Sequence, residues 1–167
     1  MEVRIASKIL AIVRIVTVTV GIAAAFYCLF GGNPELALHI VTLSTVGVVG
    51  LLSFASHVIF YKSDAERLGW SSDHPAFQVE VGFANLAFAL AAFTAFFLNW
   101  GVATEAAIVL GYALYLVQAM LRFTCRVAAE HNQRLWLNLG TFFLYSVMLL
   151  IFMVAALQSA DLPPFIY

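Results

Sequence analysis

Charged residues are scarce in this sequence. Asp, Glu, Lys and Arg make up 10% of its 167 residues, whereas apolar residues make up 63%. A soluble globular domain carries about 25% charged and about 45–50% apolar residues. Five long windows contain no Asp, Glu, Lys or Arg at all: 15–34, 36–61, 81–104, 106–121 and 135–160. The composition therefore excludes a soluble globular domain and indicates an integral membrane protein.

Basic residues are absent from every second connection between these windows. The sequence has eight basic residues. Three precede the first window (Arg4, Lys8 and Arg14), two lie between the second and third windows (Lys62 and Arg67), and three lie between the fourth and fifth (Arg122, Arg126 and Arg134). Cytoplasmic loops of membrane proteins carry the excess of Lys and Arg. The pattern predicts a cytoplasmic N-terminus, an external C-terminus and five spans. A four-span threading would place the last three arginines outside.

Several catalytic motifs are also missing. The sequence has no Cys-x-x-Cys, Gly-x-Ser-x-Gly or His-Glu-x-x-His pattern and no phosphate-binding glycine loop. Its two cysteines, Cys28 and Cys125, are expected near opposite ends of their spans, too far apart for a disulfide. The net charge of −1 gives no basis for nucleic-acid binding. We find no catalytic constellation and favour a protein that is not an enzyme.

The apolar windows predict the fold. A helix crosses the hydrocarbon layer in about 20 residues, and only helices or closed barrels span a bilayer. Long apolar runs without period-two alternation predict an all-α integral membrane protein, a five-helix antiparallel bundle with the N-terminus inside. One domain covers residues 1–167, because no long polar linker divides it. The spans are expected at about 9–31, 36–61, 76–99, 103–122 and 135–158.

Polar residues mark the expected helix starts. Asn33 followed by Pro34 and Glu35 is typical of a helix N-cap with proline in the first turn and an acid at the positive end of the helix dipole. His74 lies in a similar start, just before Pro75. Glu105, at the start of the fourth span, is expected at the level of the lipid headgroups.

Ionisable residues at membrane depth are candidates for function. Glu80 lies near the cytoplasmic start of the third span, and Arg14 lies at a similar depth in the first. A Glu80–Arg14 ion pair would remove the cost of two unpaired charges. Such a pair has two interpretations: a structural link between helices, or part of a binding or transport site.

A narrow stripe of small and polar residues runs along the third span. Its members recur at helical spacing: Gln78, Gly82, Asn85, Ala89 and Ala92. Membrane helices pack through such stripes, with amides as hydrogen-bonding groups. The alternative is a small polar cavity that opens to the cytoplasm and is lined by Gln78, Glu80 and Asn85.

Two histidines, His39 and His57, lie near opposite ends of the second span, about 27 Å apart on one helical face. Haem ligation near the inner surface would pair His57 with His74 or His131. Interfacial hydrogen bonding explains these histidines better, so we predict no cofactor and no metal site. The arginines Arg122, Arg126 and Arg134 are candidates for contact with anionic lipid headgroups.

The stretch from Leu68 to Phe88 contains the most distinctive motif. It resembles a Gly-Trp…Pro-Phe-Gln-x-Glu-Val-Gly-x-Ala-Asn-Leu pattern of a bacterial family of small integral membrane proteins of unknown function, although Ala76 here separates Pro75 from Phe77. The general layout is more loosely similar to DoxX-like membrane proteins. Neither resemblance implies an established activity. The first implies that five residues form one unit on the cytoplasmic side: His57, Trp70, Gln78, Glu80 and Asn85.

These observations predict a small multi-pass protein of the inner (cytoplasmic) membrane, with the lipid bilayer and a homo-oligomer or larger membrane complex as partners. The favoured function is a non-catalytic accessory or scaffold subunit with a polar cluster on its cytoplasmic side. A transporter or channel element that uses Glu80, Gln78, Asn85 and His57 is the first alternative. A haem- or quinone-binding redox protein is the second.

Overall fold

Nearly all of the described chain is helical. The computed structural model describes residues 2–68, 75–130 and 133–160, with side chains for 6–67, 75–121 and 140–160, and none of these residues forms a β-strand. Within this part, five helical segments are long and apolar enough to cross a membrane: Ala6–Phe30, Pro34–Ile59, Ala76–Phe97, Val102–Leu121 and Gly140–Ser159. The chain is a small polytopic membrane protein of the all-α class, as the charge-free windows predict.

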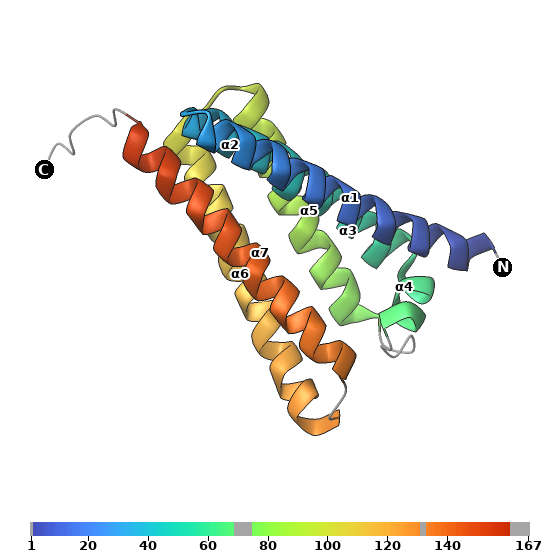
Figure 1. Ribbon diagram of the computed structural model, residues 1–167. Helices are drawn as coiled ribbons and strands as arrows, with labels where there is room; N and C mark the ends of the chain where they lie inside the picture. Colours follow the sequence, from blue (N-terminus) through green and yellow to red (C-terminus); the bar gives the residue numbers. More distant parts are fainter. Residues whose placement is uncertain (1, 69–74, 131–132, 161–167) are drawn as a thin grey trace, which may run out of the picture.

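A tight turn joins the first two spans. Helix α1 (Glu2–Phe30) ends before Gly32, whose φ of 79° is in the left-handed region that favours glycine. Asn33 then caps α2 (Pro34–Val41), because its Oδ1 accepts a hydrogen bond from the Leu36 amide at 3.0 Å. The predicted N-cap is confirmed. Figure 1 places this turn close to the C-terminal end of the last helix, and we call this side of the molecule the Asn33 end.

The second span is helical throughout but is not a regular α-helix. After α2 it passes through η1 (Thr42–Val48), α3 (Val49–Phe54) and η2 (Ala55–Ile59), and both η segments are π-helical. In a π-helical stretch the backbone hydrogen bonds join residues five apart instead of four, and such stretches are frequent at functional sites. The Tyr145 hydroxyl, from the last span, donates to the carbonyl oxygen of Thr45 at 2.7 Å.

Helix α5 (Ala76–Phe97) packs closely against the second span. The predicted stripe is buried on this contact, and its members are Gln78, Gly82, Asn85, Ala89 and Ala92. A Cβ on Gly50 would lie 2.8 Å from the carbonyl oxygen of Asn85, and one on Gly82 would collide with the Val58 side chain. The small residues therefore let two helices of the same chain approach each other.

Helices α6 (Val102–Glu130) and α7 (Gln133–Ser159) run side by side (Figure 1). Their apolar core with α2 includes the fully buried side chains of Leu38, Val109 and Phe152. In Figure 1 the α6–α7 pair spreads away from α5 toward the side opposite the Asn33 end. Many large apolar side chains elsewhere on the helices are exposed, as expected for surfaces that face lipid.

Candidate functional site

A short helix, α4 (Tyr61–Leu68), follows the second span and packs against α1 and η2. Its sequence is too charged to enter lipid, but its middle residues, Ser63 to Ala65, are buried. The hydroxyls of Ser63 and Ser7 are 2.6 Å apart and link α4 to α1. Figure 1 shows α4 on the side away from the Asn33 turn, which we call the α4 end.

Asp64 is the centre of a polar cluster at this end. Its carboxylate is fully buried, with Oδ2 2.7 Å from Nδ1 of His57 and Oδ1 2.5 Å from Nη2 of Arg67. Gln78 donates from Nε2 to Oδ2 of Asp64 at 3.3 Å and to the carbonyl oxygen of Tyr61 at 3.1 Å. Three elements, η2, α4 and α5, therefore meet at one carboxylate. We call His57, Asp64, Arg67 and Gln78 the α4-end cluster.

The cluster keeps Asp64 ionised. Burial alone would raise the pKa of its carboxyl, but the hydrogen bonds and charges of His57 and Arg67 outweigh burial and lower the pKa from 3.8 to about 2. Gln78 is itself buried, and its Oε1 has no hydrogen-bond partner among the described residues. A buried acceptor without a donor costs free energy. The cluster therefore carries one unsatisfied acceptor, Oε1 of Gln78, beside the ion pair of Asp64 and Arg67.

Arg14 and Glu80 do not meet. Arg14 points into the protein, where its Nη1 donates to Oγ of Ser53 at 3.2 Å and its charge interacts with Asp64. Glu80 is exposed on the face of α5 that also carries Phe83, and no ion pair described in the structure joins it to Arg14. The expected Glu80–Arg14 link is therefore not formed, because the interior face of α5 is the opposite one.

Asn85 forms a second polar layer, deeper in the protein than the α4-end cluster. Its Nδ2 donates to the hydroxyl of Tyr115 at 3.0 Å and to the carbonyl oxygen of Val81 at 2.8 Å. The Tyr112 hydroxyl donates to Oδ1 of Asn85 at 3.4 Å. Asn85 lies seven residues, about 10 Å along the helix, from Gln78. The two amides share a buried face, as predicted, but have separate partners.

Some candidate residues lie outside the described part of the chain. They are His74, Trp70 and His131, together with the side chains of Arg122, Arg126 and Arg134. Among the described residues, no group of three or more His, Cys, Asp and Glu side chains could hold a metal ion. Of the candidates that are described, His57 and Gln78 join one cluster, Arg14 and Asn85 lie in the interior nearby, and Glu80 lies outside.

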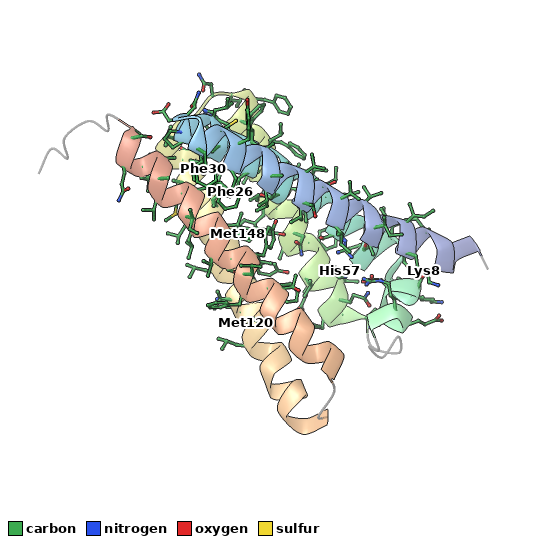
Figure 2. The ribbon with its side chains drawn as sticks, in the orientation of Figure 1. Lys8, Phe26, Phe30, His57, Met120 and Met148 are labelled. Carbon is green, nitrogen blue, oxygen red and sulfur yellow. The ribbon has the colours of Figure 1, made fainter. Side chains whose placement is uncertain are left out.

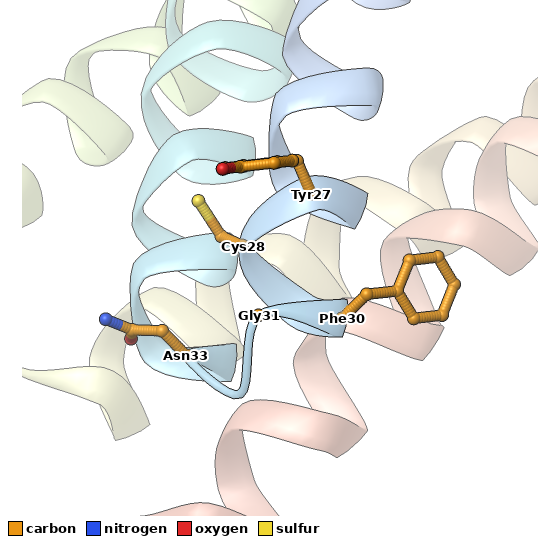
Figure 3. Close-up of a pocket in the computed structure, with 5 residues that line it drawn as sticks. All are labelled: Tyr27, Cys28, Phe30, Gly31 and Asn33. Carbon is orange, nitrogen blue, oxygen red and sulfur yellow. The ribbon is translucent and has the colours of Figure 1, made fainter.

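Two surface depressions lie at opposite ends of the molecule. One, of about 200 Å³, is lined by Ser7, Lys8, Ser63, Glu66 and Arg67 beside the α4-end cluster, and Figure 2 shows His57 and Lys8 on this same side. The other, of about 560 Å³, lies at the Asn33 turn (Figure 3). Tyr27 and Phe30, which line it, are 82% and 84% exposed, so it is an open surface rather than an enclosed site.

The comparisons with known proteins give a family. Residues 5–162, which include all five spans, match a model described as a family of unknown function, DUF6790. The chain belongs to the DUF6790 family. No curated protein and no solved structure matches this DUF6790 chain. The prediction of a family of unknown function is confirmed. The family assigns no role to the α4-end cluster, so its geometry is the basis for a function.

Asp64 is the residue of the cluster that the sequence did not single out. It lies in a short hydrophilic segment. The positive-inside rule accounts for the basic residues of that segment, so they do not draw attention to a site there. Two signals in the sequence could have found it. It follows His57 by seven residues, about two helical turns, and it precedes Arg67 by three, the spacing of a helical ion pair.

Proposed function

We propose that this protein is a small, non-catalytic transport or channel element of the cytoplasmic membrane, closed at the α4 end by the α4-end cluster. The observation that carries the proposal is the fully buried carboxylate of Asp64, which holds His57 of the second span and Gln78 of α5 against α4. His57 lies within the second span, where an ionisable group is a candidate for function, and a buried ion pair is by itself weak evidence for added stability. In this proposal, α4 is a movable cover.

The orientation of the proposed element follows the basic residues. Those with described side chains lie at the α4 end or on the helices leading to it: Lys8, Arg14, Lys62 and Arg67. The positive-inside rule then places the α4 end in the cytoplasm, with a five-helix antiparallel bundle, an internal N-terminus and an external C-terminus. In this orientation α4, the proposed cover, faces the cytoplasm, and its exposed Lys62 lies among anionic lipid headgroups.

The interior beneath α4 supports transport rather than simple packing. Arg14, Ser53 and Asn85 bring a guanidinium, a hydroxyl and an amide to membrane depth, and the π-helical segments η1 and η2 run on both sides of Ser53. Polar groups at this depth are expensive in an apolar bundle. A protein that only filled the bilayer would gain stability by replacing them with apolar residues.

The accessory or scaffold function is the second candidate, and Glu80 favours it. The small-residue stripe of α5 is occupied by the second span of the same chain, so it leaves no free seam for a partner. Glu80, however, presents a carboxylate on an apolar outer face beside Phe83, which is 53% exposed. A partner with a basic residue at that depth would cover it. Sizing in native detergent tests this function, which predicts an assembly that Glu80→Gln disrupts.

The redox alternative rests on His57 with His74 or His131, both of which lie outside the described residues. It stays a prediction, as does the likeness to DoxX-like proteins. The absorbance spectrum of the purified protein decides the haem version, because a bound haem gives a Soret band.

Thiol accessibility tests the transport proposal. In a background with Cys28→Ala and Cys125→Ala, a Ser56→Cys side chain replaces a fully buried hydroxyl next to His57. We expect a membrane-impermeant maleimide applied at the α4 end to label it about tenfold faster when Asp64→Asn is added. Glu66→Gln, a matched change of an exposed acid on α4, should leave the rate unchanged.

A second thiol separates opening from unfolding. Ala95 is fully buried on α5 near the Asn33 end, so Ala95→Cys should stay protected in the Asp64→Asn protein. Equal labelling of Ser56→Cys with and without Asp64→Asn would refute α4 as a cover, and labelling of both thiols would show general unfolding instead of an opening.

A further inference from the structure

A second histidine–acid pair lies at the Asn33 end. Nδ1 of His39 is 2.7 Å from Oε1 of Glu105, which starts α6. Glu105 is 1% exposed, and its Oε2 has no hydrogen-bond partner among the described residues. The ring of Phe96 packs edge-on against His39 with centroids 6.3 Å apart. The carboxyl group of Glu105 is therefore enclosed by protein, with one oxygen that has no partner among the described residues, and its expected depth at the lipid headgroups stays a prediction.

The second span carries buried hydroxyls between its two histidines. They belong to Thr42, Thr45, Ser53 and Ser56, none of which is more than 6% exposed. The hydroxyls of Thr42 and Ser56 have no hydrogen-bond partner in the described part of the chain. Thr42 lies one turn after His39, and Ser56 directly precedes His57. Within about one helical turn of each histidine, the second span thus carries a buried hydroxyl that has no partner among the described residues.

Other helices fill the interval between Thr45 and Ser53. The Tyr145 hydroxyl reaches the carbonyl oxygen of Thr45, and Arg14 reaches the hydroxyl of Ser53. Between them, the Tyr112 hydroxyl donates to Asn85, which lies beside Gly50 of the second span. Polar groups of α1, α5, α6 and α7 therefore lie along the second span between its two ends.

We infer that this column is a proton path, with Glu105–His39 and His57–Asp64 as its two terminal sites. The inference rests on the proposed transport function and names protons as the species carried. A proton from water at the Asn33 end adds to the Glu105–His39 pair. Each hydroxyl or intervening water then accepts a proton on one side and releases its own on the other. One proton leaves from His57 at the α4 end, and no electron moves.

The charged side chains around the two terminal sites differ. At the Asn33 end the other charged side chain among the described residues is Glu35, which is exposed on α2. At the α4 end, α4 contributes Lys62, Glu66 and Arg67 beside Asp64, α1 contributes Lys8 and Arg14, and α5 contributes Glu80 on its far face. The entry site is therefore acidic and the exit site is balanced by cations.

Proton flux into vesicles tests the path. The full chain is reconstituted in phosphatidylcholine–phosphatidylglycerol vesicles that contain a pH-sensitive dye, and a potassium diffusion potential drives protons inward. We expect flux above that of protein-free vesicles, with a loss of about tenfold in Glu105→Gln. Glu35→Gln, an exposed acid at the same end, should retain wild-type flux.

A second variant guards against misfolding of Glu105→Gln. Thr42→Val keeps the side-chain volume and removes a hydroxyl without a partner, so it should lower flux without lowering thermal stability, while Thr19→Val on the exposed face of α1 should change neither. Wild-type flux in both Thr42→Val and Glu105→Gln, or no flux above protein-free vesicles, overturns the path. If the Ser56→Cys thiol still opens with Asp64→Asn in that case, the transport function stands with another cargo.

Discussion

His57 and Asp64 lie 2.7 Å apart, Nδ1 to Oδ2, and this pair joins the last turn of the second span to α4. The carboxylate is fully buried and the imidazole nearly so. Because Asp64 also binds Arg67 and Gln78, loss of its charge would release three side chains together. The position of α4 therefore depends on one carboxylate.

Asp64→Ala should destabilise the protein more than any single change of an exposed acid. Removing one partner from a buried ion pair costs about 3–5 kcal/mol, whereas Glu66→Ala, two residues away and exposed, should cost less than about 1 kcal/mol. Reversible unfolding in mixed detergent micelles measures both. Similar losses for the two variants would show that the cluster contributes little.

The contribution of Asp64 should disappear in acid. Its pKa is about 2 in the folded protein and 3.8 in the reference state, so the folded state holds the proton less tightly. The stability this provides is complete above pH 4 and is lost as the pH falls toward 2, a change of roughly 2–3 kcal/mol. The stability difference between wild type and Asp64→Asn should shrink over that interval. A difference that stays constant from pH 5 to about 2 would contradict the assignment.

Gly82 and Gly140 should respond oppositely to alanine. A Cβ on Gly82 collides with Val58 and approaches Cβ of His57 to 3.2 Å, whereas a Cβ on Gly140 meets no atom of the described residues within 4 Å. Overpacking predicts a loss of about 1–3 kcal/mol for Gly82→Ala. Gly140→Ala should be neutral or stabilise by up to about 1 kcal/mol. Thermal unfolding of the two variants side by side checks the close approach of α5 to the second span.

Tyr145→Phe should loosen the contact between α7 and the π-helical segment η1. The hydroxyl bonds the carbonyl oxygen of Thr45, and a buried hydrogen bond contributes about 1 kcal/mol. Tyr27→Phe, at a residue that is 82% exposed, is the matched control and should have no effect. Equal stabilities would mean that water or another group satisfies Thr45 as well.

The spans and the Asn33 cap followed from the sequence because long apolar runs and local capping rules depend on neighbouring residues. The buried stripe of α5 followed from helical periodicity. That same periodicity places Glu80 about 200° from Gln78 around the helix, so the two could not both face the interior. The Glu80–Arg14 prediction overlooked this angle.

The remaining features depend on tertiary placement. The end of the second span at Phe60, with φ −105° and ψ 29°, turns the chain so that a hydrophilic segment lies against α1. Hydropathy assigns such a segment to water, and it gives no sign that Asp64 is buried. The partnership of His39 with Glu105, 66 residues apart, likewise requires knowing that α2 and α6 are neighbours.

Hydrogen–deuterium exchange of α4 in lipid nanodiscs gives the plainest readout of how α4 is fastened. The amides of Tyr61–Leu68 should exchange about tenfold faster, or more, in Asp64→Asn than in wild type, because a loss of 1.4 kcal/mol of local stability corresponds to a factor of ten. They should exchange at the wild-type rate in Glu66→Gln. Exchange of α4 that is unchanged in Asp64→Asn, or raised equally in both variants, would contradict a cover held by the His57–Asp64 pair.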